Sequence, residues 1–330
     1  MKKAQIEVSF NWIFILIAGF ALLIFFYIII TNQTETSRET LSRTIVQRMN
    51  AVFDSMQANP NTAEVHRRVT FELDFTCING VHEFRRGRSA SSSYLDHSII
   101  FTPERLGGSE LITYTTRINL PFLTTSVLYL SDARTLYFFN ETDFYYNLLD
   151  DQFEKAKGTF EEAIDKANNY RKVVFVTKLS ELSSLSGTIP DNMVVVVIHS
   201  NYLVLFLKDL NEFNPNIFDD FDAEGLFLYG YTNEIVLGAI ITGNYGLTQC
   251  NFEKINQSFE RVKFVLNERI DNITARDDIT QNCKTLMLEN KIEHNFSNTN
   301  TNNYLLFIGN MTNLETVNRN LERLGCPTIY

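Results

Sequence analysis

The chain has little positive charge and few of the residues on which binding to nucleic acids depends. Its 330 residues include 29 Lys and Arg against 39 Asp and Glu, which gives a formal net charge of −10. Proteins bind nucleic acids by displacing counterions with clustered Lys and Arg side chains. The charge balance therefore argues against a nucleic-acid partner, and it suits a soluble domain outside the cell.

Recognisable catalytic motifs are also missing. The sequence contains no H-E-x-x-H, no Walker loop, no G-x-G-x-x-G and no G-x-S-x-G, which are motifs that place zinc, phosphates or a nucleophile. Its five histidines are dispersed, and His199 with Ser200 follows an apolar stretch, where either a turn or a catalytic pair would fit. We therefore expect a non-enzymatic protein. A tethered ectoenzyme is the alternative, because catalytic triads assemble from distant residues.

One long apolar run stands out at residues 10–30. It carries no charge and one clearly polar side chain, Asn11. A helix rises 1.5 Å per residue, so this length spans the roughly 30 Å hydrocarbon core of a bilayer. A retained transmembrane helix is predicted, because the apolar core of a cleaved secretory signal is only about 7–15 residues long. The predicted anchor positions are Phe10, Trp12, Phe14, Leu16, Phe20, Leu23, Phe26 and Ile30.

The flanks of this run predict its orientation. Lys2 and Lys3 precede it, whereas the first basic residue after it is Arg38. The positive-inside rule then leaves the N-terminus in the cytoplasm and the remainder outside. We expect a single-pass protein of the cell membrane with a large extracellular domain and membrane lipid as a partner.

Cysteine is scarce and widely spaced. Cys77, Cys250, Cys283 and Cys326 all follow the apolar run, and no two of them have the C-x₂₋₄-C spacing of structural zinc sites. An even number outside the cell indicates two disulfides, with free thiols as the alternative. Of the three pairings, Cys250–Cys283 with Cys77–Cys326 is the first choice, because the first pair would close a local helical hairpin.

Residues 220–225 contain the front half of a calcium loop. Asp220, Asp222 and Glu224 alternate before a glycine, as oxygen ligands do in such loops. The acid expected at the twelfth position is replaced by Tyr231. A surface turn is the alternative interpretation, and Ca²⁺ is the only cofactor that the sequence suggests.

The remaining periodicities predict the fold. Residues 31–58 contain no Pro or Gly and carry an apolar position every three or four residues, which predicts a helical stalk that packs on its own head or on a partner helix. Strands with alternating polarity are predicted at 69–75, 98–101, 111–114 and 127–130. Continuous apolar strands at 172–176, 193–198, 203–207 and 226–229 interleave with helices at 147–170, 252–270, 279–292 and 311–324.

These elements predict an α+β fold in which an N-terminal transmembrane helix continues into a stalk helix. An antiparallel β module and a mixed α/β head with C-terminal helices follow. The predicted segments are 1–31 for the cytoplasmic leader and transmembrane helix, 32–60 for the helical stalk, 61–140 for the β-rich module, and 141–330 for the mixed α/β extracellular domain.

The N-terminus carries a short basic leader, in which two lysines and Ala4 precede Gln5 and Glu7. This pattern resembles archaeal class III signal peptides and the type IV pilin-like proteins that carry them. The resemblance implies cleavage between Ala4 and Gln5 by a prepilin-type peptidase, and packing of the N-terminal helix with other copies or pilin-like subunits. In the family a serine precedes the glutamate, whereas here Glu7 comes before Ser9. An uncleaved signal anchor is therefore the alternative.

Three further segments carry a wider resemblance. They are Phe10-Asn11-Trp12, Gly238-Ala239-Ile240 ahead of Cys250-Asn251, and Cys326-Pro327-Thr328-Ile329-Tyr330. Together they resemble uncharacterised archaeal membrane-anchored surface proteins, a group that brings no known activity. The resulting hypothesis is a non-enzymatic, membrane-anchored archaeal cell-surface protein, in its narrowest form a minor or accessory pilin-like subunit. The main alternative is a signal-anchored envelope binding protein.

Overall fold

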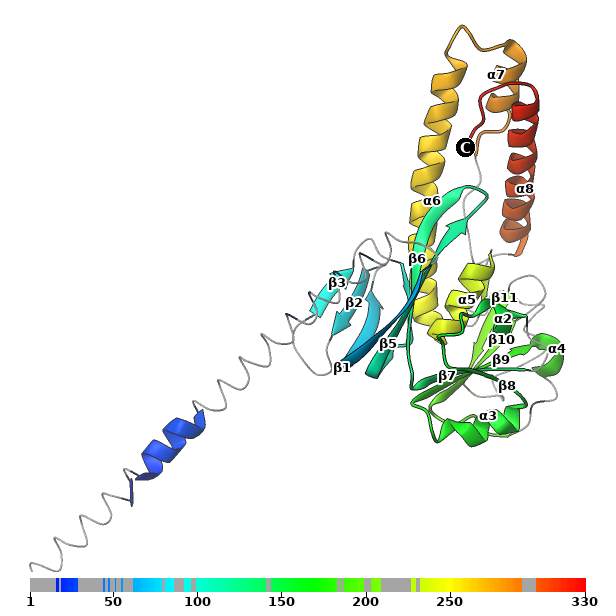
Figure 1. Ribbon diagram of the computed structural model, residues 1–330. Helices are drawn as coiled ribbons and strands as arrows, with labels where there is room; N and C mark the ends of the chain where they lie inside the picture. The colour runs from blue at the N-terminus through cyan, green and yellow to red at the C-terminus, as the bar shows by residue number, and fades with distance from the viewer. Residues whose placement is uncertain are drawn as a thin grey trace, which may run out of the picture.

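The structure is a computed structural model of the whole chain, shown in Figure 1. It describes residues 16–17, 19–28, 44, 47, 51, 55, 62–78, 81–85, 92–95, 99–140, 144–182, 185, 187–198, 203–208, 227–229, 232–292 and 301–330.

The predicted transmembrane helix is corrected by the structure. Within that segment the described helical residues are 16–17 and 19–28. None of the described helices combines the length and apolar character needed to cross a membrane. The fold class predicted from the sequence is therefore wrong in its first element. The rest of that prediction, an α+β fold, is what the structure shows, although both of its sheets are mixed.

Part of the anchor and most of the stalk lie outside the described residues. Of the anchor positions, Leu16, Phe20, Leu23 and Phe26 are described, and all four are exposed. Phe10, Trp12, Phe14 and Ile30 fall outside the described ranges. Within the predicted stalk, residues 44, 47, 51 and 55 are described and helical.

The first sheet, called sheet A, consists of the six strands β1 to β6. Its strands are β1 (Ala63–Ile78), β2 (Val81–Arg85), β3 (Ser92–Leu95), β4 (Ile100–Phe101), β5 (Arg105–Asn119) and β6 (Leu123–Asp132), in the order β3-β2-β1-β5-β6-β4. All pairs are antiparallel except β4 with β6. In β1 the buried Leu73 and Phe75 alternate with the exposed Glu72 and Thr76, because successive side chains of a strand point to opposite faces.

The second sheet, sheet B, has a parallel centre. Its strands are β7 (Thr135–Phe139), β8 (Lys155–Lys157), β9 (Lys172–Lys178), β10 (Met193–Ile198), β11 (Leu203–Leu207) and β12 (Phe227–Tyr229), in the order β12-β11-β10-β9-β7-β8. The strands β8, β7, β9 and β10 run parallel, and β11 and β12 extend the sheet antiparallel. Residues of β10 are buried throughout, because helices cover both faces of the parallel part.

The single helix predicted at 147–170 is wrong. That segment contains α2 (Tyr145–Leu148), β8 and α3 (Phe160–Ala167). Gly158 has φ +156°, and a new helix begins after Thr159. The Thr159 hydroxyl accepts from the Glu162 N–H at 3.4 Å, and Glu162 Oε2 accepts from the Thr159 N–H at 3.0 Å. This capping box marks the N-terminus of α3. The helix predicted at 147–170 is therefore interrupted at Thr159, where α3 begins.

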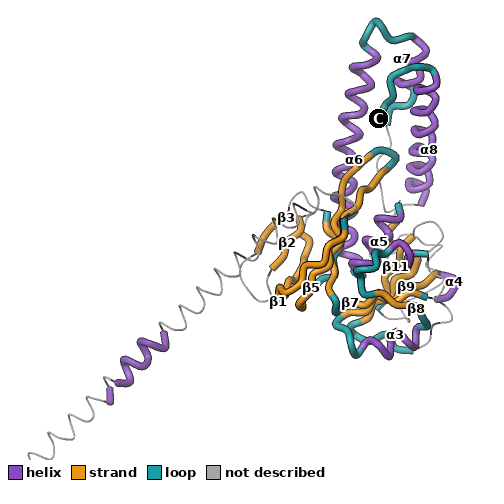
Figure 2. The backbone as a smooth tube through the Cα atoms, in the orientation of Figure 1, coloured by secondary structure: helices purple, strands orange, loops and turns teal. Residues whose placement is uncertain are grey.

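Helix α5 (Asn233–Thr242) is the central element of the core, because it packs against both sheets. Figure 2 shows it where the two sheets meet. Every residue from Ile235 to Thr242 is buried, so the helix is apolar all round and has no polar face. On the other face of sheet B lie α3 and α4 (Leu179–Leu182). Because α5 contacts both sheets, residues of sheets A and B belong to one hydrophobic cluster with α5 and the later helices.

Gly238 allows α5 to approach sheet A closely. A Cβ at this position would lie 2.6 Å from three ring atoms of Phe101 in β4. Gly238→Ala is therefore expected to lower the free energy of unfolding by about 1–3 kcal/mol, as overpacked core substitutions do, despite the better helix propensity of alanine. Urea denaturation measures this change.

Gly246→Ala is the matched control. Gly246 lies in the first turn of the next helix, and the nearest atom to its added Cβ would be Asn244 Oδ1 at 3.5 Å, an ordinary contact. We expect it to leave stability within about 0.5 kcal/mol of the parent. Equal stabilities for the two variants would contradict the close contact of Gly238 with Phe101.

Three helices project from the sheets as a helical arm. They are α6 (Tyr245–Thr274), α7 (Gln281–Leu288) and α8 (Thr301–Arg323), and Figure 1 shows them extending to one side of the molecule. The start of α6 packs on sheet A, and its end packs on α7. The buried residues of the arm, among them Phe259, Met287 and Leu321, belong to the same cluster as the sheets. The arm is thus continuous with the core.

Candidate functional site

All four cysteines are paired, but not as first expected. The disulfides are Cys77–Cys250, with a Cα–Cα distance of 6.2 Å, and Cys283–Cys326, with a Cα–Cα distance of 5.8 Å. The first choice, Cys250–Cys283 with Cys77–Cys326, is therefore wrong.

The position of α7 along α6 explains the correction. The Ile292 N–H, just after α7, donates to Asn267 Oδ1 at 3.0 Å, so α7 lies beside the far end of α6. Cys250 lies near the start of α6. Positions 250 and 267 are seventeen steps apart in sequence, which corresponds to about 26 Å along the helix axis. This distance is far beyond the reach of a disulfide to Cys283.

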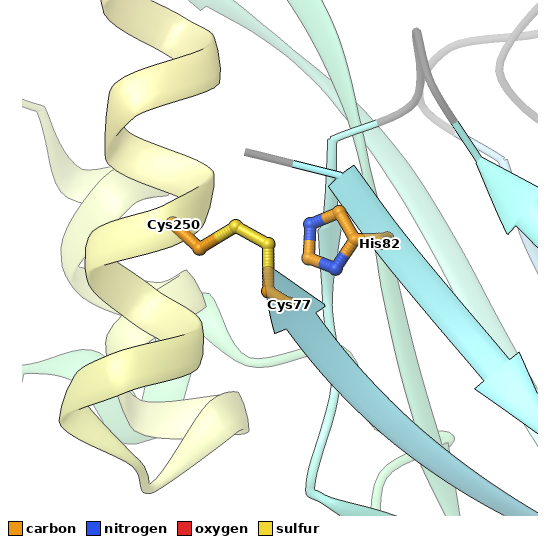
Figure 3. Close-up of side chains that lie close together, drawn as sticks. All are labelled: Cys77, His82 and Cys250. Carbon is orange, nitrogen blue, oxygen red and sulfur yellow. A yellow bond between two sulfur atoms is a disulfide. The ribbon is translucent and has the colours of Figure 1, made fainter. Parts of the chain in front are cut away.

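Cys77 and Cys250 meet a buried histidine. In the β1–β2 hairpin Cys77 is the direct register partner of His82, and side chains of opposite residues in an antiparallel pair lie on the same face. The first turns of α6 bring Cys250 to that face. A ring nitrogen of His82 and the two Sγ atoms lie within 4.8 Å of one another, and Figure 3 shows the imidazole beside the disulfide. We call these three residues the Cys77/His82/Cys250 cluster.

Asn251, the next residue of α6, fixes the protonation of the histidine. Its Nδ2 donates to the carbonyls of Ile100 at 2.7 Å and Leu247 at 3.1 Å, and its Oδ1 accepts from the Ile100 N–H at 3.0 Å. The same Oδ1 lies 2.7 Å from His82 Nε2. Because Oδ1 can only accept, Nε2 carries the proton and Nδ1 keeps its lone pair.

The histidine is held in its neutral form. Burial and, to a smaller extent, the positive charge of Lys254 lower the pKa of His82 from 6.5 to about 4, although the hydrogen bond to Asn251 acts in the opposite direction. The side chain is 0% exposed, and Nδ1 has no hydrogen-bond partner. A buried polar atom without a partner costs about 1–3 kcal/mol, which makes this nitrogen unusual in a folded core.

The cluster offers donors of the kind that bind thiophilic metals, namely two sulfurs and one imidazole nitrogen. In the disulfide form the sulfurs are bonded to each other. Sequence reasoning missed this site because it sought two cysteines at short spacing. The signal that could have revealed it is Cys77 and His82 on either side of the Asn79-Gly80 turn sequence, a hairpin arrangement that places them opposite each other.

The other site residues predicted from the sequence lie outside the described residues. They are Ala4, Gln5 and Glu7 of the processing site, Asp220, Asp222 and Glu224 of the calcium loop, and His199, which follows β10 in the sequence. The processing site and the Ca²⁺ site therefore remain predictions.

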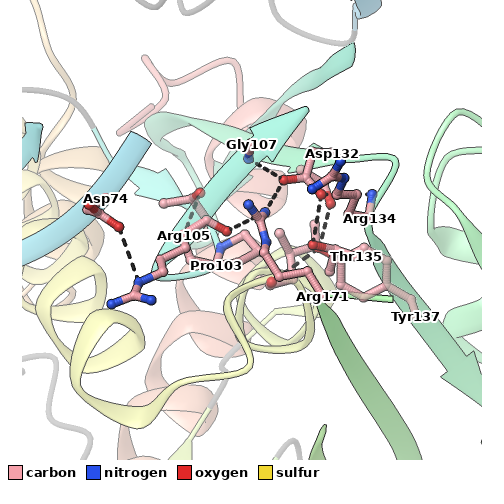
Figure 4. A network of polar contacts seen from close by, with 12 residues as sticks. Asp74, Pro103, Arg105, Gly107, Asp132, Arg134, Thr135, Tyr137 and Arg171 are labelled. Atoms are coloured by element: carbon pink, nitrogen blue, oxygen red, sulfur yellow. Dashed lines mark hydrogen bonds and ion pairs between the residues drawn. The ribbon is translucent and has the colours of Figure 1, made fainter. Parts of the chain in front are cut away.

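A second polar cluster joins the two sheets and surrounds Asp132 (Figure 4). Asp132 ends β6 and is 0% exposed. Its carboxylate accepts from the Gly107 N–H at 2.7 Å, the Arg134 N–H at 2.9 Å and the Thr135 hydroxyl at 3.2 Å. It also pairs with the Arg171 guanidinium. Four donors from both sheets thus converge on one buried carboxylate.

Arg171 and Arg105 extend this cluster to the surface. Arg171 immediately precedes β9 and also donates to the Arg105 carbonyl at 2.7 Å. The Arg105 guanidinium pairs with Asp74 at 3.2 Å, with exposed fractions of 76% and 35% for the two side chains. Asp132 pairs with Arg171 and Asp74 pairs with Arg105, so these charges are satisfied by one another. We interpret it as the structural joint between sheets A and B.

The carboxyl edge of the parallel strands is where α/β enzymes place catalytic groups. Glu181 accepts there from Thr177 at 3.2 Å and from Asn140. The described residues of this edge include no histidine or cysteine. Asn140, Thr177 and Glu181 bind one another at this edge.

Comparisons with protein families, with curated proteins and with solved structures give no match.

Proposed function

We propose that this chain is a non-enzymatic cell-surface protein whose folded head works in an oxidising environment outside the cell. The observation that carries this proposal is that both cysteine pairs form disulfides and none of the four cysteines is free. Disulfides persist outside the cell and in other oxidising compartments, whereas cytosolic thiols are kept reduced.

The placement of the disulfides supports a structural role for them. Cys77–Cys250 joins β1 to α6 across 173 residues of sequence, and Cys283–Cys326 joins α7 to the segment after α8 across 43 residues. Each bond therefore holds the helical arm in place at one of its ends. Cross-links over such long loops restrict the unfolded chain most and stabilise a fold by about 2–4 kcal/mol each.

The polar clusters favour a role without catalysis. The buried Asp132 is surrounded by four donors, and Glu181 is held by Asn140 and Thr177. An active site instead needs groups that are free to reach a substrate. These contacts, together with the missing motifs, support the expectation that the protein is not an enzyme.

Binding to an envelope partner is the second candidate function, and one observation favours it. In α6 the side chains of Phe264 and Val265 are 65% and 61% exposed, although neighbouring Leu266 is buried in the core. Contiguous exposed apolar surface marks interaction sites, and these two side chains supply apolar surface on the arm. The helical arm would then be the part of the head that contacts the partner.

The narrower form of the proposal is a minor or accessory pilin-like subunit, supported by the resemblance of the leader. In that form Gln5 is the first residue of the mature protein, and the N-terminal segment contacts other copies or pilin-like subunits. In the broader form of the proposal, the protein is an uncleaved cell-surface protein and membrane lipid is its partner. Intact mass of the native protein distinguishes them, because the pilin-like form loses Met1 to Ala4 and the uncleaved form keeps them.

Labelling of intact cells tests the location. A membrane-impermeant amine reagent is expected to modify exposed lysines of the head, such as Lys157 and Lys166, before the cells are broken. A cytosolic protein of the same cells serves as the control and must remain unlabelled. If the head lysines react only after lysis, the proposal of a cell-surface protein is wrong.

A further inference from the structure

We propose that reduction of the Cys77–Cys250 disulfide creates a binding site for a thiophilic divalent metal ion of the Zn²⁺ class. The ligands are the thiolates of Cys77 and Cys250 and the imidazole of His82. This inference goes beyond the proposed function and stands independently of where the protein works.

The positions of the donor atoms carry the proposal. The two sulfurs and a His82 ring nitrogen already lie within 4.8 Å of one another. Around a tetrahedral zinc ion, two thiolate sulfurs at about 2.3 Å from the metal lie about 3.8 Å apart. After the S–S bond breaks, side-chain rotations can therefore reach this arrangement from backbones whose Cα atoms are 6.2 Å apart.

The unpaired nitrogen of His82 is the second observation. The side chain is 0% exposed, and Nδ1 has no hydrogen-bond partner, while Nε2 is bound to Asn251 Oδ1 at 2.7 Å. Histidines that ligate metals usually donate their other ring N–H to a carbonyl or carboxylate oxygen, which fixes the ring and its tautomer. Asn251 already does this, so Nδ1 is left as the ligand atom.

The charge of the complex also fits its surroundings. Lys254 is buried, and its positive charge acts on His82. A lone divalent cation would be repelled by Lys254. Two thiolates neutralise the two positive charges of the metal, so the complete site adds no net charge beside the lysine. Three protein ligands leave a fourth position for water or a small ligand, as in catalytic zinc sites.

The redox step balances with a dithiol as the reductant. One thiolate of the dithiol attacks a sulfur of the Cys77–Cys250 bond, and its second thiolate then releases the second cysteine as the dithiol closes to a cyclic disulfide. Two electrons and two protons pass to the cysteines. Binding of the metal ion then releases those two protons, because the ligands are thiolates.

Titration of the full chain with Co²⁺ tests the proposal, since Co²⁺ reports thiolate ligands by charge-transfer absorption. The dithiol-reduced protein, freed of the dithiol under anaerobic conditions, is expected to bind one equivalent and to release it when Zn²⁺ is added. The same protein with its disulfides intact is expected to give no such absorption. Absence of the absorption after reduction would overturn the proposal.

Variants identify the ligands. Cys283→Ser with Cys326→Ser removes the other cysteine pair and is expected to leave the absorption intact. Cys77→Ser with Cys250→Ser is expected to abolish it, and His82→Gln is expected to weaken binding by at least about tenfold, the smallest effect usual for the surroundings of a metal. If the absorption is lost with Cys283 and Cys326 instead, the metal binds elsewhere and the proposal is wrong. Absence of the absorption in the reduced parent overturns the proposal even where a variant does not fold.

Discussion

Asp132→Ala is expected to lower the free energy of unfolding by about 3–5 kcal/mol, the usual cost of removing one partner from a buried ion pair. The substitution leaves Arg171 without its carboxylate and removes the acceptor of the Gly107 N–H and the Arg134 N–H. Each buried donor that loses its partner adds to the cost. The change also weakens the contact between sheets A and B, because Asp132 ends β6 and Arg171 precedes β9.

Asp74→Ala is the matched control within the same cluster. Asp74 also pairs with an arginine, Arg105, at 3.2 Å, but both side chains are partly exposed to solvent. Exposed ion pairs contribute about 0–1 kcal/mol, so this variant is expected to remain close to the parent. Urea denaturation of both variants measures the difference. Similar losses for the two would show that burial of Asp132 does not govern the strength of the joint.

The second large effect is a pH dependence of stability that originates at His82. The pKa of His82 is about 4 in the folded protein, compared with 6.5 for an unperturbed histidine, which represents the unfolded chain. Between these values the unfolded chain binds a proton that the folded chain does not, so protons favour unfolding. The stability from neutral His82 is fully present above pH 6.5 and is lost as the pH falls toward 4. The shift corresponds to about 3 kcal/mol.

His82→Gln isolates this contribution, because carboxylates also titrate in the same range. The variant lacks the titrating imidazole but keeps a polar side chain beside Asn251. Denaturation of the disulfide-bonded proteins in the presence of a chelator, at several pH values from 4 to 7, gives the two stability profiles. The parent is expected to lose about 3 kcal/mol more than the variant over this range. Parallel profiles would mean that His82 is not buried in its neutral form.

Local patterns in the sequence predicted several elements of this fold. The apolar runs at 172–176 and 193–198 correspond to β9 and β10, because strands covered on both faces are apolar without interruption. The helix predicted at 252–270 lies within α6, since its apolar positions recur with the period of a helix. Apolar runs and helical periodicity depend only on residues that are close together in the sequence and on which faces of an element are buried.

Helix α5 shows where periodicity fails. It is buried on all sides between two sheets, so its sequence has no polar face and therefore no helical period. The transmembrane prediction rested on length and apolar character alone, and none of the described helices combines the two to the extent that a membrane span requires.

Long-range contacts explain why the candidate site could not be predicted. His82 and Asn251 are 169 residues apart, and Cys77 and Cys250 are 173 apart. Their meeting depends on how the start of α6 packs on sheet A, and no local spacing encodes this packing. The preference for Cys250–Cys283 assumed a short helical hairpin. Helix α6 instead runs from Tyr245 to Thr274, and Cys250 lies near its start, far from the end that packs on α7.

The central claim is that the two disulfides join β1 to α6 and α7 to the segment after α8, and mapping them in the native protein tests it most directly. Cells are treated with a thiol-blocking reagent before lysis, and the unreduced protein is digested and analysed by mass spectrometry. We expect linked peptides containing Cys77 with Cys250 and Cys283 with Cys326, and no blocked cysteine. Peptides linking Cys250 to Cys283, or four blocked thiols, would contradict the account.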